Sequence, residues 1–307
     1  MRKKRLVIGT RGSKLAMWQA NHIAARLTAE HKEIEVILQH IVTTGDKILD
    51  VPLAKIGGKG LFTKELENAM LAGDIDLAVH SLKDMPTELP EGLTLAAITE
   101  RMDPEDAFIS PKYKTIDGLP QGAKIGTSSL RRKAQLLHYR PDLVAVDLRG
   151  NIDTRLKKLE QENLDGILLA VAGLKRLGWD GQITQIVPMN ICLPAVGQGA
   201  LAIEARENDS EVLPLLACLE HPPTRAAVTA ERAFLREVEG GCQIPIGVYG
   251  SVQEGGLSVE AIIASPDGKS VIRDKIEGSP EGAALLGVTL ARRMLDAGGR
   301  QLLSCII

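Results

Sequence analysis

Two segments of the chain recur in the same order, and this internal repetition constrains the fold more than any other feature. Ile8-Gly9-Thr10 recurs 117 positions later as Ile125-Gly126-Thr127. Leu77-Ala78-Val79 recurs 92 positions later as Leu169-Ala170-Val171. One short match arises easily by chance among strand–turn–helix segments, but two matches in the same order favour duplication of one lobe. We therefore predict two similar lobes that hold a ligand between them.

The composition limits the kinds of partner. A length of 307 residues exceeds the usual size of one core, so two or three domains are expected. The net charge of −2 gives the whole molecule no attraction for nucleic acid or anionic membrane, so an anion site needs a local cluster of Arg and Lys. No apolar run approaches the roughly eighteen residues of a membrane span, and no apolar stretch follows the basic N-terminus as in a signal peptide. We expect a cytoplasmic protein with a small-molecule substrate.

The cysteines predict neither a metal site nor a disulfide framework. Cys192, Cys218, Cys242 and Cys305 lie far apart, without Cys-x-x-Cys spacing or a histidine at ligand distance. We therefore expect no metal.

Strands and helices alternate along the first two thirds of the chain. Apolar runs at 6–8, 36–42 and 75–79 predict strands, with helices after Ser13 and from 61 to 71, and this alternation is typical of a mainly parallel sheet. The pattern repeats with predicted strands at 125, 144–146 and 167–170 and helices after Ser129 and Asn151; residues 200–204 are expected to return as a strand to the first sheet. From Pro222 a helix, strands with turns at 254–256 and 265–268, and a final helix at 281–295 indicate a smaller α+β domain. The predicted domains are 1–99 with 200–217, 100–199, and 218–307.

Seven basic residues follow predicted strands or lie near helix starts, where the partial positive charge of the helix disfavours them. They are Arg11, Lys83, Arg131, Arg132, Arg149, Arg155 and Arg176. Each alone could be a solvated surface residue, but loops at the carboxyl edge of an open α/β sheet meet at one place. Together they predict a site for an anion with several carboxylates, because guanidinium groups bind carboxylates two oxygens at a time.

Three other features carry chemistry, each with an ordinary structural alternative. Asp84 is an acid among these cations. Its carboxylate is suited to stabilise positive charge that develops during a reaction, or to form a salt bridge with Lys83. Cys242 directly follows two glycines, which favours an accessible thiol that bonds a soft carbon electrophile, although a lone cysteine is more often a small buried hydrophobe. Residues 55–62 lack the Walker spacing and suggest a mobile lid with Lys55, Lys59 and Phe62, or an irregular surface loop.

These residues stand in motifs that resemble the porphobilinogen deaminase (hydroxymethylbilane synthase) family of tetrapyrrole biosynthesis. The motifs are Ile8 through Ala16, Val79 through Pro86, Gly126 through Arg132, Arg149 through Arg155, Gly197-Gln198-Gly199-Ala200-Leu201 and Gly240 through Pro245. They span the chain in order.

The resemblance implies a fold, a reaction and a cofactor. The fold is two periplasmic-binding-protein-like lobes and a third domain. The enzyme is a transferase that deaminates four porphobilinogen molecules, couples them head to tail, and hydrolytically releases linear hydroxymethylbilane. It works on a dipyrromethane cofactor held by a thioether at Cys242, and a monomer is the expected state.

The resemblance also assigns roles to residues of this sequence. Asp84 is the catalytic residue. The cofactor is bound by Lys83, Asp84, Thr127, Ser128, Ser129, Arg131, Arg132 and Arg155, and the substrate by Arg11, Ser13, Gln19, Ser81, Arg149, Asn151, Arg155, Arg176 and Gln198.

Two other classes of function stay open on the residues alone. A non-catalytic anion-binding protein could use the same two lobes, but it leaves Asp84 and Cys242 without a role. A phosphate-handling transferase lacks support, because no nucleotide-binding motif or metal-binding carboxylate cluster occurs in the sequence.

Overall fold

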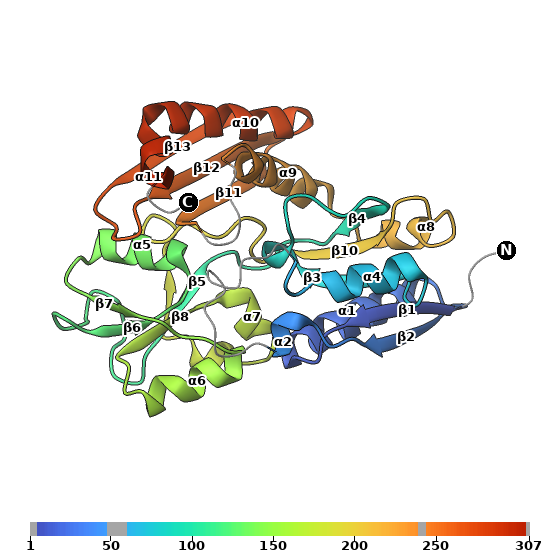
Figure 1. Ribbon diagram of the computed structural model, residues 1–307, viewed down its shortest axis with the longest axis horizontal. Helices are drawn as coiled ribbons and strands as arrows, with labels where there is room; N and C mark the ends of the chain where they lie inside the picture. The colour runs from blue at the N-terminus through green and yellow to red at the C-terminus, as the bar shows by residue number, and fades with distance from the viewer. Residues whose placement is uncertain (1–4, 48–59, 239–243, 305–307) are drawn as a thin grey trace. The chain divides into compact units, whose positions relative to one another are not determined.

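A computed structural model of the protein describes residues 5–47, 60–238 and 244–304 (Figure 1). The chain divides into two compact units, Met1–Arg101 with Ala200–Arg225 and Met102–Gly199 with Ala226–Ile307.

The first unit is built on a five-stranded sheet in the order β2-β1-β3-β10-β4. The strands are β1 (Arg5–Thr10), β2 (Glu35–His40), β3 (Leu77–Ser81), β4 (Leu93–Ile98) and β10 (Leu201–Arg206). The helices are α1 (Lys14–Glu30), α2 (Thr44–Lys47), α4 (Lys64–Ala72), α8 (Leu213–Leu216) and the 3₁₀ turns η1 (Leu82–Asp84) and η3 (Ala217–Leu219). Strand β1 pairs in parallel with β2 and β3, whereas β10 runs antiparallel to both β3 and β4.

Alternate residues of β1 enter the two cores of this unit. Leu6 and Ile8 are fully buried in one cluster with residues of α1, and Val7 packs against the other cluster, which contains Leu66 and Met70 of α4. One helix therefore covers each face of the sheet, as strand–helix alternation requires.

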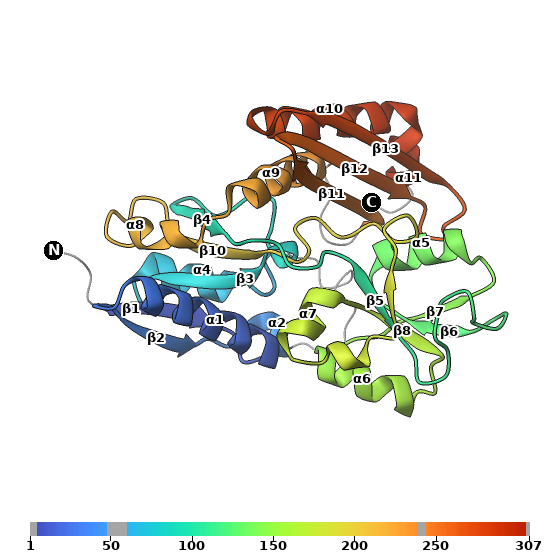
Figure 2. The ribbon, with the colours of Figure 1, turned by 180° about the vertical axis from the view of Figure 1, so that it is seen from behind.

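A second five-stranded sheet lies in the other unit, in the order β7-β6-β8-β5-β9 (Figure 2). Its strands are β5 (Asp106–Ile109), β6 (Lys124–Gly126), β7 (Val144–Val146), β8 (Gly166–Ala170) and β9 (Gln185–Val187). Its helices are α5 (Leu130–Tyr139), α6 (Ile152–Gln161), α7 (Val171–Arg176) and the 3₁₀ turn η2 (Asp180–Gln182).

The two sheets have the same topology, which confirms the predicted pair of α/β lobes. In each sheet the first three strands are parallel, and the fourth, β10 or β5, is antiparallel to both of its neighbours. Strand β10 follows the second lobe in the chain and returns to the first sheet, as predicted. Strand β5 opens the second lobe, so the antiparallel strand of each sheet is the one that follows a crossing between lobes.

The second repeat, however, is three residues out of structural register. Strand pairing places Leu77 beside Ile8 and Gly166 beside Ile125, so Leu77 corresponds to Gly166 and not to Leu169. The apolar run in the second lobe continues from the end of β8 into α7, where Val171 is fully buried. The hydrophobic similarity in the sequence therefore aligned the start of β3 with the end of β8.

The last third of the described chain forms a smaller α+β region with a three-stranded antiparallel sheet, as predicted. Its elements are α9 (Pro222–Glu237), β11 (Ile246–Gln253), β12 (Gly256–Ala264), β13 (Val271–Gly278), the 3₁₀ turn η4 (Pro280–Gly282), α10 (Ala283–Met294), the π-helical turn η5 (Leu295–Gly299) and α11 (Arg300–Ser304). Glu254 and Gly255 both have positive φ, which suits the two-residue turn between β11 and β12. This sheet and the second lobe share one compact unit, so the predicted division into three domains stays a prediction.

Helices α9 and α10 approach so closely that the contact requires glycine. A Cβ on Gly287 of α10 would lie 2.1 Å from the carbonyl oxygen of Ala230 in α9. Alanine is favoured over glycine in a helix by about 1 kcal/mol, but overpacking a buried backbone contact costs roughly 1–3 kcal/mol. We expect Gly287→Ala to lower the denaturation midpoint of the α+β region, measured by urea titration. Gly181→Ala, where nothing lies within 4 Å of the new Cβ, is the control; an unchanged Gly287→Ala midpoint would contradict the packing.

Candidate anion-binding site

In the first unit, the predicted residues gather where the parallel strands β1 and β3 end. Gln19 of α1 is buried and donates from Nε2 to Ser81 Oγ over 2.8 Å, which joins α1 to the end of β3. Lys83 and Asp84 follow in η1, and Asp84 is exposed. Ser13 caps α1, and its Oγ accepts from the amide of Ala16 over 3.2 Å, as expected.

Arg11 follows β1 and is held by an acid that the sequence did not single out. Its Nε donates to Asp46 Oδ1 over 3.2 Å, and its Nη2 lies 2.5 Å from the same oxygen. The guanidinium carbon lies 4.2 Å from the centroid of the Phe62 ring, a cation–π distance. Burial raises the pKa of Asp46, but hydrogen bonds from Arg11 and Thr43 outweigh it, so the net pKa is lowered. Arg11 is thus oriented by Asp46 and Phe62.

In the second unit, three hydroxyl residues connect the end of β6 to the start of α5. Thr127 Oγ1 accepts from the Ser129 amide over 3.2 Å, and Ser129 is the N-cap of α5, as predicted. Ser128 Oγ accepts from the Leu148 amide over 3.0 Å and lies 3.1 Å from its carbonyl oxygen. These hydroxyls therefore fix the loop that presents the two following arginines.

Arg131 and Arg132 are both buried, and the carboxylate of Asp106 pairs with both, so part of their charge is neutralised within the protein. Arg131 Nη1 lies 2.7 Å from Asp106 Oδ2, and Arg132 Nη2 lies 2.7 Å from Asp106 Oδ1. Burial alone would raise the pKa of Asp106, but the charges of the two arginines outweigh it and hold that pKa well below its usual range. Asp106 was not singled out from the sequence, because only the fold brings it close to Arg131 and Arg132 of α5.

Arg176 is a buried cation with an unused donor. It is 5% exposed, and its Nη2 donates to the carbonyl oxygen of Gly199 over 2.6 Å. Among the described residues, its Nε has no hydrogen-bond partner, and neither has Nε of Arg132. Burial lowers the pKa of Arg176 to about 10. Gln198 is also buried, and its Nε2 donates to Asp106 Oδ1 over 2.9 Å.

The remaining predicted residues of this unit surround the start of α6. Arg155 Nε donates to the carbonyl oxygen of Gly150 over 2.8 Å, across the turn that begins the helix. Asn151 is exposed at the N-cap position and makes no side-chain capping bond. Arg149 is half-buried.

Cys242, Lys55 and Lys59 lie outside the described residues. Of the described cysteines, Cys192 is buried beside Asp106, and burial raises the pKa of its thiol to about 12. Burial also raises the pKa of Cys218. Because the thiolate is the nucleophile, neither is suited to covalent attachment of a ligand at neutral pH.

We expect Cys192 to resist alkylation in the folded protein. After treatment with iodoacetamide at pH 8, peptide mass spectrometry should find Cys192 unmodified in the native protein and modified after unfolding in urea. Rapid native modification of Cys192 would contradict its burial and raised pKa.

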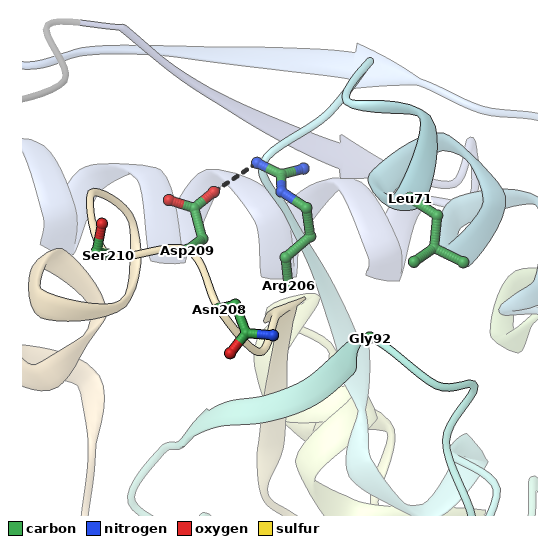
Figure 3. A pocket seen from close by; sticks show the side chains of 6 residues that line it. All are labelled: Leu71, Gly92, Arg206, Asn208, Asp209 and Ser210. Carbon is green, nitrogen blue, oxygen red and sulfur yellow. Dashed lines mark hydrogen bonds and ion pairs between the residues drawn. The ribbon is translucent and has the colours of Figure 1, made fainter.

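A surface pocket elsewhere in the first unit does not offer a free cation. It is lined by Leu71, Gly92, Arg206, Asn208, Asp209 and Ser210 (Figure 3). The Arg206 guanidinium already donates to the carbonyl oxygens of Met70 and Ile75 and to the carboxylates of Asp76 and Asp209. The predicted anion site is therefore not this pocket.

Comparison with known proteins identifies the family. The model described as "Porphobilinogen deaminase, dipyromethane cofactor binding domain" matches residues 6–214, and "Porphobilinogen deaminase, C-terminal domain" matches residues 225–296. The chain belongs to the porphobilinogen deaminase family. Every basic residue of the predicted anion site falls within the cofactor-binding part of this family's sequence.

Relatives in the family are similar over nearly their whole length. The porphobilinogen deaminase of Trichlorobacter lovleyi is 55% identical over 303 residues, covering 99% of this chain and 97% of the relative. That of Pelotomaculum thermopropionicum is 54% identical, covering 98% and 96%. Among solved structures, the methionine-binding protein MetQ has a TM-score of 0.46 and 12% identity, covering 70% of this chain and 90% of that one. No helix in the described part of the chain has the length and apolar character needed to span a membrane.

The buried arginines fit the carboxylate-bearing dipyrromethane that the family's cofactor-binding domain holds. The Nε atoms of Arg132 and Arg176 are buried donors without an acceptor among the described residues, and such donors are costly unless a ligand satisfies them. Acetate and propionate groups on pyrrole rings are acceptors of the required charge.

Proposed function

We propose that this protein is a hydroxymethylbilane synthase. It deaminates four porphobilinogen molecules, couples them head to tail on a covalently bound dipyrromethane, and releases linear hydroxymethylbilane by hydrolysis with loss of four ammonia. The observation that carries this function is the set of buried guanidinium groups with unused donors, within a chain of the porphobilinogen deaminase family.

The residues divide into two groups by role. Arg131, Arg132, Arg155, Lys83 and the hydroxyls of Thr127, Ser128 and Ser129 bind the carboxylates of the dipyrromethane. The carboxylates of the incoming porphobilinogen are bound by Arg11, Arg149, Arg155, Arg176, Ser13, Gln19, Ser81, Asn151 and Gln198. Several charge-assisted hydrogen bonds per ring fix its orientation, which aligns the reacting carbon atoms.

The Asp84 carboxylate stabilises positive charge that develops during the reaction. Departure of ammonia from porphobilinogen leaves an electron-poor methylene-pyrrole whose N–H carries part of the positive charge. The Asp84 carboxylate accepts a hydrogen bond from that N–H and stabilises the cation while the new carbon–carbon bond forms. When bound, the dipyrromethane supplies the electron-rich pyrrole carbon to which each new ring is joined.

Cys242 is the proposed attachment point. Cys192 is buried and Cys218 is half-buried, and the raised pKa values of both thiols disfavour them as nucleophiles. The two glycines that precede Cys242 suit it to a turn that exposes its sulfur. In the proposed division of the chain, Cys242 belongs to a third domain at 218–307, and the two lobes are 1–99 with 200–217 and 100–199.

The cellular setting is part of the proposal. We infer a cytoplasmic monomer that acts on a small molecule, with neither nucleic acid nor membrane as a partner. The net charge of −2 supports this, because it gives no general attraction to polyanions. Residues 55–62, with Lys55, Lys59 and Phe62, are proposed to close over the substrate.

Stoichiometry tests the proposed function. Purified protein given porphobilinogen should release four ammonia for each linear tetrapyrrole, which then closes to a ring spontaneously and absorbs in the porphyrin region after oxidation. A non-catalytic anion-binding protein would bind porphobilinogen and release no ammonia, and that result would contradict the proposal.

A further inference from the structure

Asp106 lies at the centre of the buried cation cluster, and none of the roles above includes it. It begins strand β5 and is completely buried. Four groups surround its carboxylate: Arg131 Nη1 and Arg132 Nη2 at 2.7 Å, Gln198 Nε2 at 2.9 Å and the Cys192 thiol at 3.3 Å. Three of these come from residues placed in the ligand site on other grounds.

The carboxylate binds the outer ends of the two guanidinium groups. Oδ2 accepts from Nη1 of Arg131, and Oδ1 accepts from Nη2 of Arg132. Carbonyl oxygens complete the arrangement, since Arg131 Nη1 also donates to Leu193 and Arg132 Nη1 donates to Leu168. With these ends fixed, the Nε edge of Arg132 keeps a buried donor without an acceptor in the described part of the chain.

The charges of this cluster do not balance. Two buried guanidinium groups share one buried carboxylate, and Arg176, also buried, lies in the helix that follows the strand paired with β5. A buried charge without a partner is strongly destabilising, so Asp106 offsets part of the positive charge and leaves the rest for a ligand. An arginine fixed before the ligand arrives also loses less conformational entropy on binding.

We propose that Asp106 is a positioning residue for the anionic ligand. It holds Arg131 and Arg132 in one orientation, so that their remaining donors receive the carboxylates of the pyrrole chain. This inference rests on the proposed function, and it adds an acid whose effect on the substrate is indirect.

Two substitutions and a matched control test this role in the full-length holoenzyme. Asp106→Asn keeps the shape of the side chain but removes the charge. Asp106→Glu keeps the charge that folding of the buried arginines requires, yet shifts the carboxylate by one methylene. Asp142→Asn is the control, because Asp142 pairs with Arg140 through two hydrogen bonds of 2.7 Å just beyond the end of α5.

The readouts separate ligand positioning from folding. The melting temperature reports folding, the intact mass reports the fraction of molecules that carry a two-pyrrole adduct, and KM and kcat for porphobilinogen are measured for that fraction. Because Arg131 and Arg132 are assigned to the dipyrromethane, loss of their charge-assisted hydrogen bonds to Asp106 should lower the fraction of molecules that carry the adduct about tenfold or more in Asp106→Asn, with a smaller change in KM and kcat of the remaining adduct-bearing protein. Asp106→Glu should also lower this adduct-bearing fraction while its melting temperature stays near that of the wild type, and Asp142→Asn should leave the fraction unchanged.

A double-mutant cycle shows whether Asp106 works through an arginine. In an Arg132→Lys background, Asp106→Asn should lower the adduct-bearing fraction by a smaller factor than in the wild type, because the guanidinium group that Asp106 positions has already been replaced. Should Asp106→Asn fail to fold, the folded Asp106→Glu protein decides. A wild-type adduct-bearing fraction in Asp106→Glu overturns the positioning role, whereas a wild-type protein without adduct or product overturns the proposed function itself.

Discussion

Replacing Asp84 by asparagine is expected to lower kcat roughly a hundred- to thousandfold while the protein still folds and carries its adduct. The charge that stabilises the developing cation is lost, and removal of one such electrostatic group from an active site typically has an effect of about this size. Since Asp84 is exposed at the end of η1, its substitution leaves no buried group without a partner. Single-turnover kinetics with porphobilinogen, together with the intact mass, would measure both effects.

Glu88→Gln is the matched control for this experiment. Glu88 is an exposed carboxylate four residues further along the chain, and its substitution should change kcat by less than about twofold. Binding of porphobilinogen to Asp84→Asn should also persist, because the arginines supply that affinity. Full turnover by Asp84→Asn would remove the proposed catalytic role.

Replacing Cys242 by serine is expected to abolish the adduct and, with it, all product formation. A hydroxyl group is a much weaker nucleophile for a soft carbon electrophile than a thiolate, so the covalent link should not form. The melting temperature should fall as well, because the buried arginines lose the carboxylates that would satisfy their unused donors.

Cys218→Ser is the control for the attachment point. Cys218 is half-buried, and its sulfur lies 3.4 Å from the carbonyl oxygen of Leu215. That variant should keep the adduct and its activity. An adduct of undiminished mass on Cys242→Ser, or its loss in Cys218→Ser, would place the attachment elsewhere.

Much of the fold could be predicted because its signals are local. Ser13 and Ser129 cap α1 and α5 as expected, and the glycine-containing turns after β11 and β12 separate strands of the predicted pattern. Strands β4, β5 and β9 were not predicted, whereas the short strands β6 and β7 were. The antiparallel pairing of β5 with β9 follows from the topology of the sheet.

The candidate site was predicted in its residue types but not in its connections. The arginines that follow strands predicted an anion site. The pairing of Arg131 and Arg132 with Asp106 was not predicted, because it joins residues about 25 positions apart. These residues meet only when β5 packs beside β8. Likewise, Asp46 reaches Arg11 from 35 positions away. Sequence spacing cannot show such contacts, because they depend on which strands become neighbours.

The most direct measurement is the intact mass of the protein as purified, before and after incubation with porphobilinogen. The account predicts a mass above that of the polypeptide by two linked pyrrole units, with further increments of one pyrrole when substrate is supplied in limiting amounts. A protein that has the mass of the bare polypeptide, and keeps it after incubation with porphobilinogen, would contradict the account.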